Sequence, residues 1–339
     1  SLAGVLKEQG KLEEAEALFR QAMEGYEATL GATDKDTLVS ISNLAVVLKE
    51  QGKLEEAEAL FRRAMEEYEA TLGATHERTV ISISWLAVVL KEQGKLEEAE
   101  ALFRQAMEGR EVTLGATHKD TLFSISLLAR VLKEQGKLEE AEALSRRAME
   151  GYEATLGATH KNTLFSISLL ARVLKTQGKL EEAEVLSRLA MAGYEATIGA
   201  THKDTLKSIF GLAQVLEEQG KLEEAEAPFR RAMEGREVTL GATHKDTLSS
   251  ISSLAGVLKE QGKLEEAEAL FRRAMEGREA TLGATHKDTL RSILQLVQVL
   301  KKQEKLEEAE ALQRKREAAV NYEQGRAEMT RGNNAAAEP

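Results

Sequence analysis

Hydrophobic side chains recur along the chain at helical spacing, in two alternating kinds of segment. Between Asp34 and Gln51 the apolar positions follow the helical period and comprise Ile41, Leu44, Ala45 and Leu48. Between Leu54 and Leu72 a second set follows the same period and comprises Leu54, Ala57, Phe61, Ala64, Tyr68 and Leu72. Gly52 stands between the two segments and supplies the left-handed conformation that ends a helix at little cost. The pattern therefore predicts two amphipathic helices joined by a short turn.

The helix pair recurs every 42 residues, because the string GKLEEAE begins at Gly10 and returns in phase through the chain, ending as EKLEEAE at Glu304. A second block, TLGAT or TIGAT followed by HKDTL or a close variant, begins at Thr29 and has the same period. Since the connections are short, successive helices must pack antiparallel. We expect eight repeats, the first truncated, over residues 1–33, 34–75, 76–117, 118–159, 160–201, 202–243, 244–285 and 286–327. A disordered polar tail over residues 328–339 is expected to follow them.

Local signals refine the predicted helices. Thr33 and Asp36 have the spacing of a capping box that opens the next helix. Pro228 lies inside the sixth of the second helices, and it should kink that helix or interrupt its hydrogen bonds locally, because proline lacks the backbone N–H. After Leu312 the sequence becomes polar, which predicts a last helix that shields the final repeat from water.

These residues resemble the tetratricopeptide repeat, in particular the 42-residue type of kinesin light chains and nephrocystin-like proteins. The signature positions of that repeat are occupied by Leu44, Ala45, Leu48, Gly52, Leu54, Ala57, Phe61 and Ala64. The resemblance covers about residues 1–320, and Lys119 and its equivalents stand where the kinesin light chain linker usually has proline. It implies an all-α, right-handed superhelical solenoid of antiparallel helix pairs.

Composition and charge exclude several classes of protein. The chain has 46 basic and 57 acidic side chains, a net charge of -11, which argues against a nucleic-acid binder. No apolar run approaches the roughly 18 residues that would span a bilayer, so we expect no membrane insertion. The chain lacks cysteine, which removes thiolate zinc sites and cysteine nucleophiles. It begins at Ser1 without an apolar leader, and we expect a cytoplasmic protein whose targeting segment, if it has one, lies upstream.

Candidate catalytic and metal-binding residues are few. Six histidines share one linker position and are His76, His118, His160, His202, His244 and His286. Equivalent positions in stacked helices lie about 10 Å apart, whereas two ligands of one zinc ion approach within about 4 Å. The row therefore does not chelate a single ion. No phosphate-binding glycine loop or activated serine motif is present. We expect no enzyme activity, no cofactor and no bound metal.

Three positions of the first helix differ most between repeats, the series that contain Val39, Asn43 and Val46. At 100° per residue they span about 60° of the helix surface, opposite the core positions. We call this side the variable face. In the resembled family it lines the concave groove where partner peptides lie, and the resemblance implies the same role here. The candidate partner-binding residues are Asn43, Ile81, Trp85, Phe123, Leu127, Arg130, Phe165, Leu169, Arg172 and Phe210.

A structural explanation competes for two of the aromatic residues. Phe123 and Phe165 occur in the repeats whose second helix has Ser145 and Ser187 where other repeats have phenylalanine. They would then fill the space left by the missing rings instead of lining a groove. Trp85 has no such partner in the sequence and is the strongest candidate for an anchor.

The sequence thus predicts a non-catalytic scaffold that binds an extended segment of another protein. An acidic-aromatic peptide is the favoured partner, because Arg130 and Arg172 could meet its carboxylates. The alternatives are a kinesin light chain-like cargo adaptor, an architectural subunit of a larger assembly, and the repeat arm of a nucleotide-regulated signalling protein. The sequence leaves the oligomeric state open.

Overall fold

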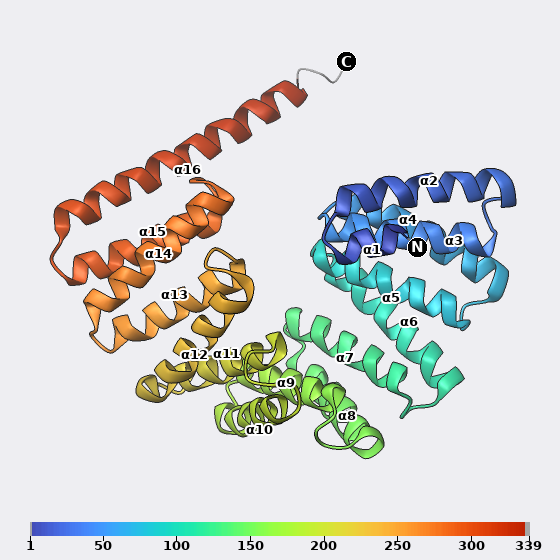
Figure 1. The fold of residues 1–339 in the computed structure, drawn as a ribbon, viewed down its shortest axis with the longest axis horizontal. Helices are drawn as coiled ribbons and strands as arrows, with labels where there is room; N and C mark the ends of the chain where they lie inside the picture. Colours follow the sequence, from blue (N-terminus) through green and yellow to red (C-terminus); the bar gives the residue numbers. More distant parts are fainter. Residues whose placement is uncertain (1, 336–339) are drawn as a thin grey trace. The chain divides into compact units, whose positions relative to one another are not determined.

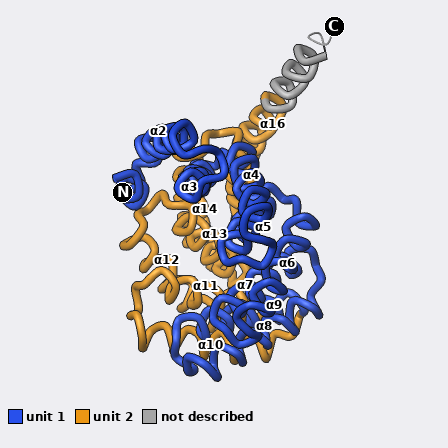
Figure 2. Tube along the Cα trace, turned by 90° about the vertical axis from the view of Figure 1, so that its right-hand side faces the viewer, with its two compact units in different colours: residues 1–177 blue, residues 178–339 orange. Residues whose placement is uncertain are grey.

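The computed structural model describes the backbone of residues 2–335 and the side chains of residues 2–322. This part of the chain forms sixteen helices and no strand, in two compact units, residues 1–177 and 178–339 (Figures 1 and 2). The helices of the first unit are α1 (Leu2–Glu8), α2 (Leu12–Leu30), α3 (Lys35–Glu50), α4 (Leu54–Leu72), α5 (Glu77–Glu92), α6 (Leu96–Leu114), α7 (Lys119–Glu134), α8 (Leu138–Leu156) and α9 (Lys161–Thr176). Those of the second unit are α10 (Leu180–Ile198), α11 (Lys203–Glu218), α12 (Leu222–Leu240), α13 (Lys245–Glu260), α14 (Leu264–Leu282), α15 (Lys287–Lys302) and α16 (Leu306–Ala335).

Within each compact unit every helix packs against the next one along the chain. The predicted helices over 34–51 and 54–72 are found as α3 and α4, each within one residue of its expected bounds. The all-α stack of helix pairs is therefore confirmed. Helix α16 continues to Ala335, beyond residue 327, where we expected the last repeat to end. The final residues of the expected tail, 336–339, lie outside the described part of the chain.

The core of each unit is continuous across its repeats. Ile41 and Leu44 of α3 are fully buried, as are Ala57 and Phe61 of α4. One apolar cluster in the first unit extends from Ala3 to Val173, and one in the second unit extends from Leu212 to Ala309. Each repeat therefore completes the burial of its neighbour, as stacked repeats require.

Glycine permits close contact between the two helices of several repeats. In the second unit Gly235 of α12 faces Leu206 of α11, and a Cβ added to Gly235 would lie 2.4 Å from Leu206 Cδ2. The corresponding distance is 2.6 Å between Gly277 and Leu248. No side chain larger than hydrogen fits there without movement of a buried leucine.

The first helices begin one residue later than the predicted capping boxes. The N-cap of α3 is Asp34, not Thr33, and its carboxylate accepts a hydrogen bond of 2.8 Å from the backbone N–H of Asp36. In the following repeats the linker histidine takes this role, and the Nδ1 of His118 accepts from the N–H of Asp120 at 3.3 Å. All six histidines cap a helix in this way. The capping-box prediction was wrong, because the side chain of the next residue satisfies the free N–H.

Helix α12 continues through Pro228, and its backbone hydrogen bonds are interrupted there only locally, because proline has no N–H to donate. Ala225, three residues before the proline, and Phe229, directly after it, are fully buried. Their packing holds the helical backbone although Pro228 donates no hydrogen bond.

Charged side chains join the second helices of successive repeats. Glu226 of α12 accepts hydrogen bonds from Arg230 at 2.9 Å and from Lys263, which precedes α14, at 2.6 Å. Arg230 also donates to Glu266 of α14 at 2.6 Å. The hydrogen bond from Lys263, followed by that from Arg230, lowers the pKa of Glu226 to about 2. The same arrangement recurs around Glu16, so it belongs to the repeat.

We predict that Gly235→Ala destabilises the protein relative to Gly211→Ala. Both residues lie inside helices, but a Cβ at Gly211 would meet no atom within 4 Å. Gly211→Ala should raise the free energy of unfolding by about 0.5–1 kcal/mol through helix propensity. Gly235→Ala gains the same propensity, but it overpacks the contact with Leu206 at a cost of about 1–3 kcal/mol. Chemical denaturation measures the difference, and equal stability of the two variants would contradict the close packing.

We predict that His202→Ala lowers the free energy of unfolding by about 0.5–2 kcal/mol, because it removes the N-cap of α11. His202→Asp should keep the stability of the natural chain, since Asp34 caps α3 with the same geometry. Thermal unfolding monitored by circular dichroism compares the two variants. If both melted at the temperature of the natural chain, the cap would contribute nothing.

We predict an acid-sensitive contribution from Glu226. Its folded-state pKa of about 2 lies below the ordinary value of 4.5, so its ion pairs stabilise the fold above pH 4.5 and are lost as the pH falls towards 2. Glu226→Gln should lower the free energy of unfolding at pH 7 by about 0.5–1 kcal/mol, a small effect because the paired cations are partly exposed. As the pH falls through about 2, the stabilities of the variant and the natural chain should converge. The exposed Glu223→Gln serves as the control in the same denaturation series.

Candidate partner-binding site

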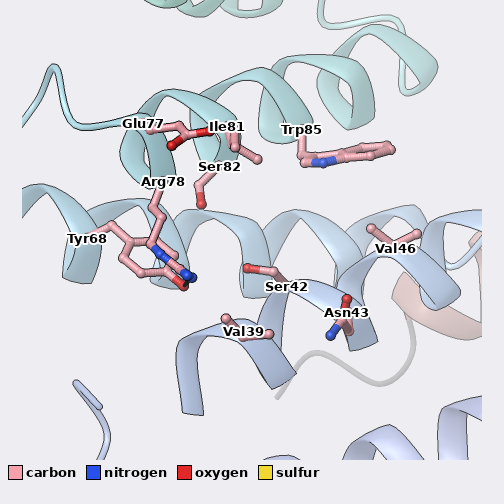
Figure 3. Close-up of a pocket in the computed structure, with 10 residues that line it drawn as sticks. All are labelled: Val39, Ser42, Asn43, Val46, Tyr68, Glu77, Arg78, Ile81, Ser82 and Trp85. Carbon is pink, nitrogen blue, oxygen red and sulfur yellow. Dashed lines mark hydrogen bonds between the residues drawn. The ribbon is translucent and has the colours of Figure 1, made fainter. Parts of the chain in front are cut away.

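A cavity of about 330 Å³ opens on the variable face between α3 and α5. Figure 3 shows Ile81, Ser82 and Trp85 of α5 pointing towards α3 across it. The lining residues are Val39, Ser42, Asn43, Val46, Tyr68, Glu77, Arg78, Ile81, Ser82 and Trp85. The structure thus brings three of the predicted candidates, Asn43, Ile81 and Trp85, into one site.

Trp85 lines one wall of the cavity and is half-buried. Its ring lies parallel to that of Phe61, with ring centroids 6.0 Å apart and an angle of 4° between the planes. Lys49 Nζ lies 5.7 Å from the indole centroid. Trp85 therefore has an aromatic partner in the preceding repeat, a contact that the sequence alone did not indicate. The stacking fixes the indole in one orientation and leaves part of its surface to the cavity.

Arg78 lies at one end of the cavity and reaches from α5 towards Tyr68 of α4 (Figure 3). Its Nη1 donates a hydrogen bond of 3.5 Å to the hydroxyl of Tyr68, and its guanidinium lies 6.0 Å from the tyrosine ring centroid. Most repeats have aspartate at this position. A positive charge in the first turn of a helix opposes the helix dipole. That departure was the sequence signal that could have placed Arg78 among the candidates.

The remaining apolar candidates divide by exposure. Ile81 and Phe123 are 40% and 48% exposed, whereas Leu127 and Leu169 are only 8% and 2% exposed. The expectation that Leu127 and Leu169 project openly from the variable face is not met. Their position packs against the second helix of the preceding repeat, as Trp85 packs on Phe61. A leucine there is short enough to be covered completely.

The exposure of Phe123 argues against the repacking explanation for that residue, because a side chain that fills a core space is buried. Ser145 is fully buried, and its hydroxyl donates to the carbonyl of Ala141 at 2.7 Å. Trp85 packs on Phe61 of the preceding repeat, and the repeat places Leu169 at the equivalent position relative to Ser145. Leu169, and not Phe123, is therefore the residue that faces the position where Ser145 replaces phenylalanine. Phe165 is half-buried, so its exposure lies between that of Phe123 and that of Leu169.

Phe210 lies in the second compact unit and packs against Phe229 and Arg236. It meets Phe229 edge-on with ring centroids 5.4 Å apart, and the guanidinium of Arg236 lies 4.5 Å from its ring centroid. Arg236 is buried and donates to the hydroxyl of Ser250 at 2.7 Å. Burial lowers the pKa of Arg236, with the charge of Asp246 opposing that shift. Phe210 therefore joins the core of its own unit more than an open surface.

Arg130 lines a smaller hollow of about 50 Å³ beside Leu127 and Lys91. It is half-buried, and Arg172 on α9 is exposed. The surrounding protein, followed by the charge of Arg130, lowers the pKa of Arg172, which remains charged at neutral pH. The two arginines thus act on each other electrostatically and form the basic part of the variable face.

Within the described residues, no three histidine, aspartate or glutamate side chains come together as metal ligands do. None of the helices has an apolar stretch of the length and hydropathy that a bilayer span requires, over the same part of the chain. The lining of the cavity combines aromatic and aliphatic side chains with the cation of Arg78, the carboxylate of Glu77 and the amide of Asn43.

Comparisons with known proteins agree with this architecture. Among solved structures, a candidate kinesin light chain from Podosopora anserina with nearly identical TPR-like repeats is 27% identical, with a TM-score of 0.54 over 60% of this chain and 95% of that one. BtubC (BKLC) from P. vanneervenii is 20% identical, with a TM-score of 0.57 over 68% of this chain and 92% of that one. The quorum sensor NprR from B. thuringiensis is 13% identical, with a TM-score of 0.67 over 94% and 85% of the two chains. At 20% and 13% identity the latter two show the fold alone.

A comparison with curated proteins finds no match to the chain. Six overlapping segments, residues 1–70, 36–111, 78–154, 121–196, 164–237 and 246–321, match the tetratricopeptide repeat family. Together they cover most of the chain, in phase with the helix pairs described above. The chain therefore belongs to the tetratricopeptide repeat family.

Proposed function

We propose that the protein is a non-catalytic scaffold whose variable face in the first compact unit binds an extended segment of a partner protein. The observation that carries this proposal is the cavity between α3 and α5, which is walled by Val46, Ile81 and Trp85 and open to solvent. Large apolar side chains on an exposed concave surface are typical of protein interaction sites.

The cavity has the features of an anchor site for one partner side chain. Its volume of about 330 Å³ lies at the lower end of the range for small-molecule pockets. Trp85 offers a rigid aromatic surface because Phe61 holds it from behind. A fixed aromatic anchor loses little conformational entropy on binding, and such residues contribute most to interface affinity.

The contact surface continues along the chain beyond the cavity. Phe123 of α7 is exposed, and Arg130 and Arg172 add positive charge on the same faces of α7 and α9. This order of groups favours a partner that combines an aromatic residue with acidic ones. An acidic-aromatic peptide in an extended conformation is the partner class we propose, with Asn43, Ile81 and Trp85 receiving the apolar part.

A cargo adaptor of the kinesin light chain kind is one form of this function. The likeness to the candidate kinesin light chain from Podosopora anserina, at 27% identity, supports it over an architectural role or a signalling arm. An open reading frame that encodes a heptad coiled coil upstream of Ser1 would favour the adaptor, whereas an upstream phosphate-binding loop would favour the signalling arm.

We predict that Trp85→Ala weakens binding of a fluorescein-labelled peptide, in which glutamates flank one tryptophan, by at least about tenfold. Val112→Ala provides the matched control, because Val112 is an exposed apolar residue of α6 outside the variable face. Fluorescence anisotropy measures the affinities, and circular dichroism checks that both variants remain folded. Equal affinity of folded Trp85→Ala and the natural chain would exclude the cavity as the anchor site.

A further inference from the structure

Lysine and glutamate side chains join the ends of successive first helices in the first compact unit. The nitrogen–oxygen distances are 3.9 Å for Lys7–Glu50, 3.6 Å for Lys49–Glu92 and 2.9 Å for Lys91–Glu134. In each pair the glutamate belongs to the repeat that follows the lysine. We call this row of ion pairs the lysine–glutamate ladder. It neutralises one lysine at each step along the variable face.

The ladder is interrupted after α7. Lys133 is the next lysine in register, but Thr176 occupies the position of its glutamate at the end of α9. The hydroxyl of Thr176 donates to the carbonyl of Arg172 at 2.9 Å and brings no charge. Among the residues that the structure describes, the Lys133 ammonium has no ion-pair or hydrogen-bond partner, and only more distant charges act on it. Lys133 is therefore a lysine of the row without a glutamate as its ion-pair partner.

Other cations surround this interrupted step. Burial, followed by the charge of Arg172, lowers the pKa of Lys133, and Lys175 and Lys91 act in the same direction. Glu134 is the opposing charge, but its carboxylate already pairs with Lys91. A further carboxylate at this point would relieve the repulsion between the bases.

We propose that an acidic side chain of an extended partner segment occupies the place opposite Lys133, where Thr176 replaces the glutamate of the ladder. This inference rests on the proposed function and adds the position and the charge of one contact. Thr176 lies four residues after Arg172 and eleven after Phe165, which places all three on the variable face of α9. The partner carboxylate would pair with Lys133 as Glu134 pairs with Lys91.

The charges favour a single carboxylate over a nucleic acid at this place. Glu92 and Glu134 stand beside the lysines and would repel a phosphate backbone that followed the row. The whole chain carries a net charge of -11, which opposes any extended polyanion. A peptide that combines acidic and apolar side chains matches one unpaired base on a face that also carries Phe123 and Phe165.

The test is Thr176→Glu, which supplies the missing carboxylate from the chain itself, with Thr176→Gln as the uncharged control. The probes are the glutamate-flanked tryptophan peptide and its twin with glutamine in place of every glutamate. Thr176→Glu should weaken binding of the glutamate peptide about five- to tenfold and leave the glutamine twin unchanged. It should also raise the melting temperature, whereas Thr176→Gln should change neither measurement. Added salt should weaken the binding of the glutamate peptide more on the natural chain than on Thr176→Glu.

Each other outcome overturns the inference in a recognisable way. If the natural chain bound both peptides equally and Thr176→Glu affected neither, the carboxylate contact and the acidic character of the partner would be wrong, while the scaffold function and the anchor site at Trp85 would stand. If neither peptide bound the natural chain, both proposals would fail together. If the sedimentation coefficient of the natural chain rose with concentration, the chain would self-associate. If Thr176→Glu then lowered that coefficient, the carboxylate opposite Lys133 would come from a second copy of the chain.

Discussion

Neither helix of a repeat can bury its apolar stripe against the other alone, and the next repeat completes the burial. Phe61 shows this directly, since it is covered by its own helix pair on one side and by Trp85 and Leu86 of the following repeat on the other. The requirement fixes the 42-residue phase, because a shift of one residue would turn these side chains by 100° away from the core. It also defines which side chains are free to vary, namely those whose direction takes them away from this shared interior.

Freedom to vary is not the same as exposure, and the series that contains Trp85, Leu127 and Leu169 shows why. The position shared by these three residues lies at the edge of the variable face. A side chain there packs against the second helix of the preceding repeat. Tryptophan is too large to be covered and contributes to a cavity, whereas leucine is enclosed. Side-chain size, more than position, therefore decides whether this series serves the core or a partner.

The helix pairs, their bounds and their phase could be predicted from the sequence, because apolar periodicity reports burial directly. The role of the linker histidines could not, since histidine is an uncommon N-cap and the neighbouring Thr33 and Asp36 offered a more familiar motif. The stacking of Trp85 on Phe61 was equally hidden, because it joins side chains of two repeats whose facing directions follow only from the packed structure. The charge of Arg78 and the replacement at Thr176 were visible in the sequence, but their meaning depends on which residues face them.

The histidine caps have a consequence for the chemistry of the linker row. A ring nitrogen that accepts a backbone N–H must be unprotonated, so the neutral ring of each capping histidine carries its proton on Nε2. All six imidazoles are thus held in one tautomer, and their outward edges act as donors and not as lone-pair ligands. A transition-metal ion could bind such an imidazole through Nε2 only if the ring proton moved to Nδ1, which would remove the hydrogen bond that caps the helix, so metal binding and helix capping compete at each of these positions.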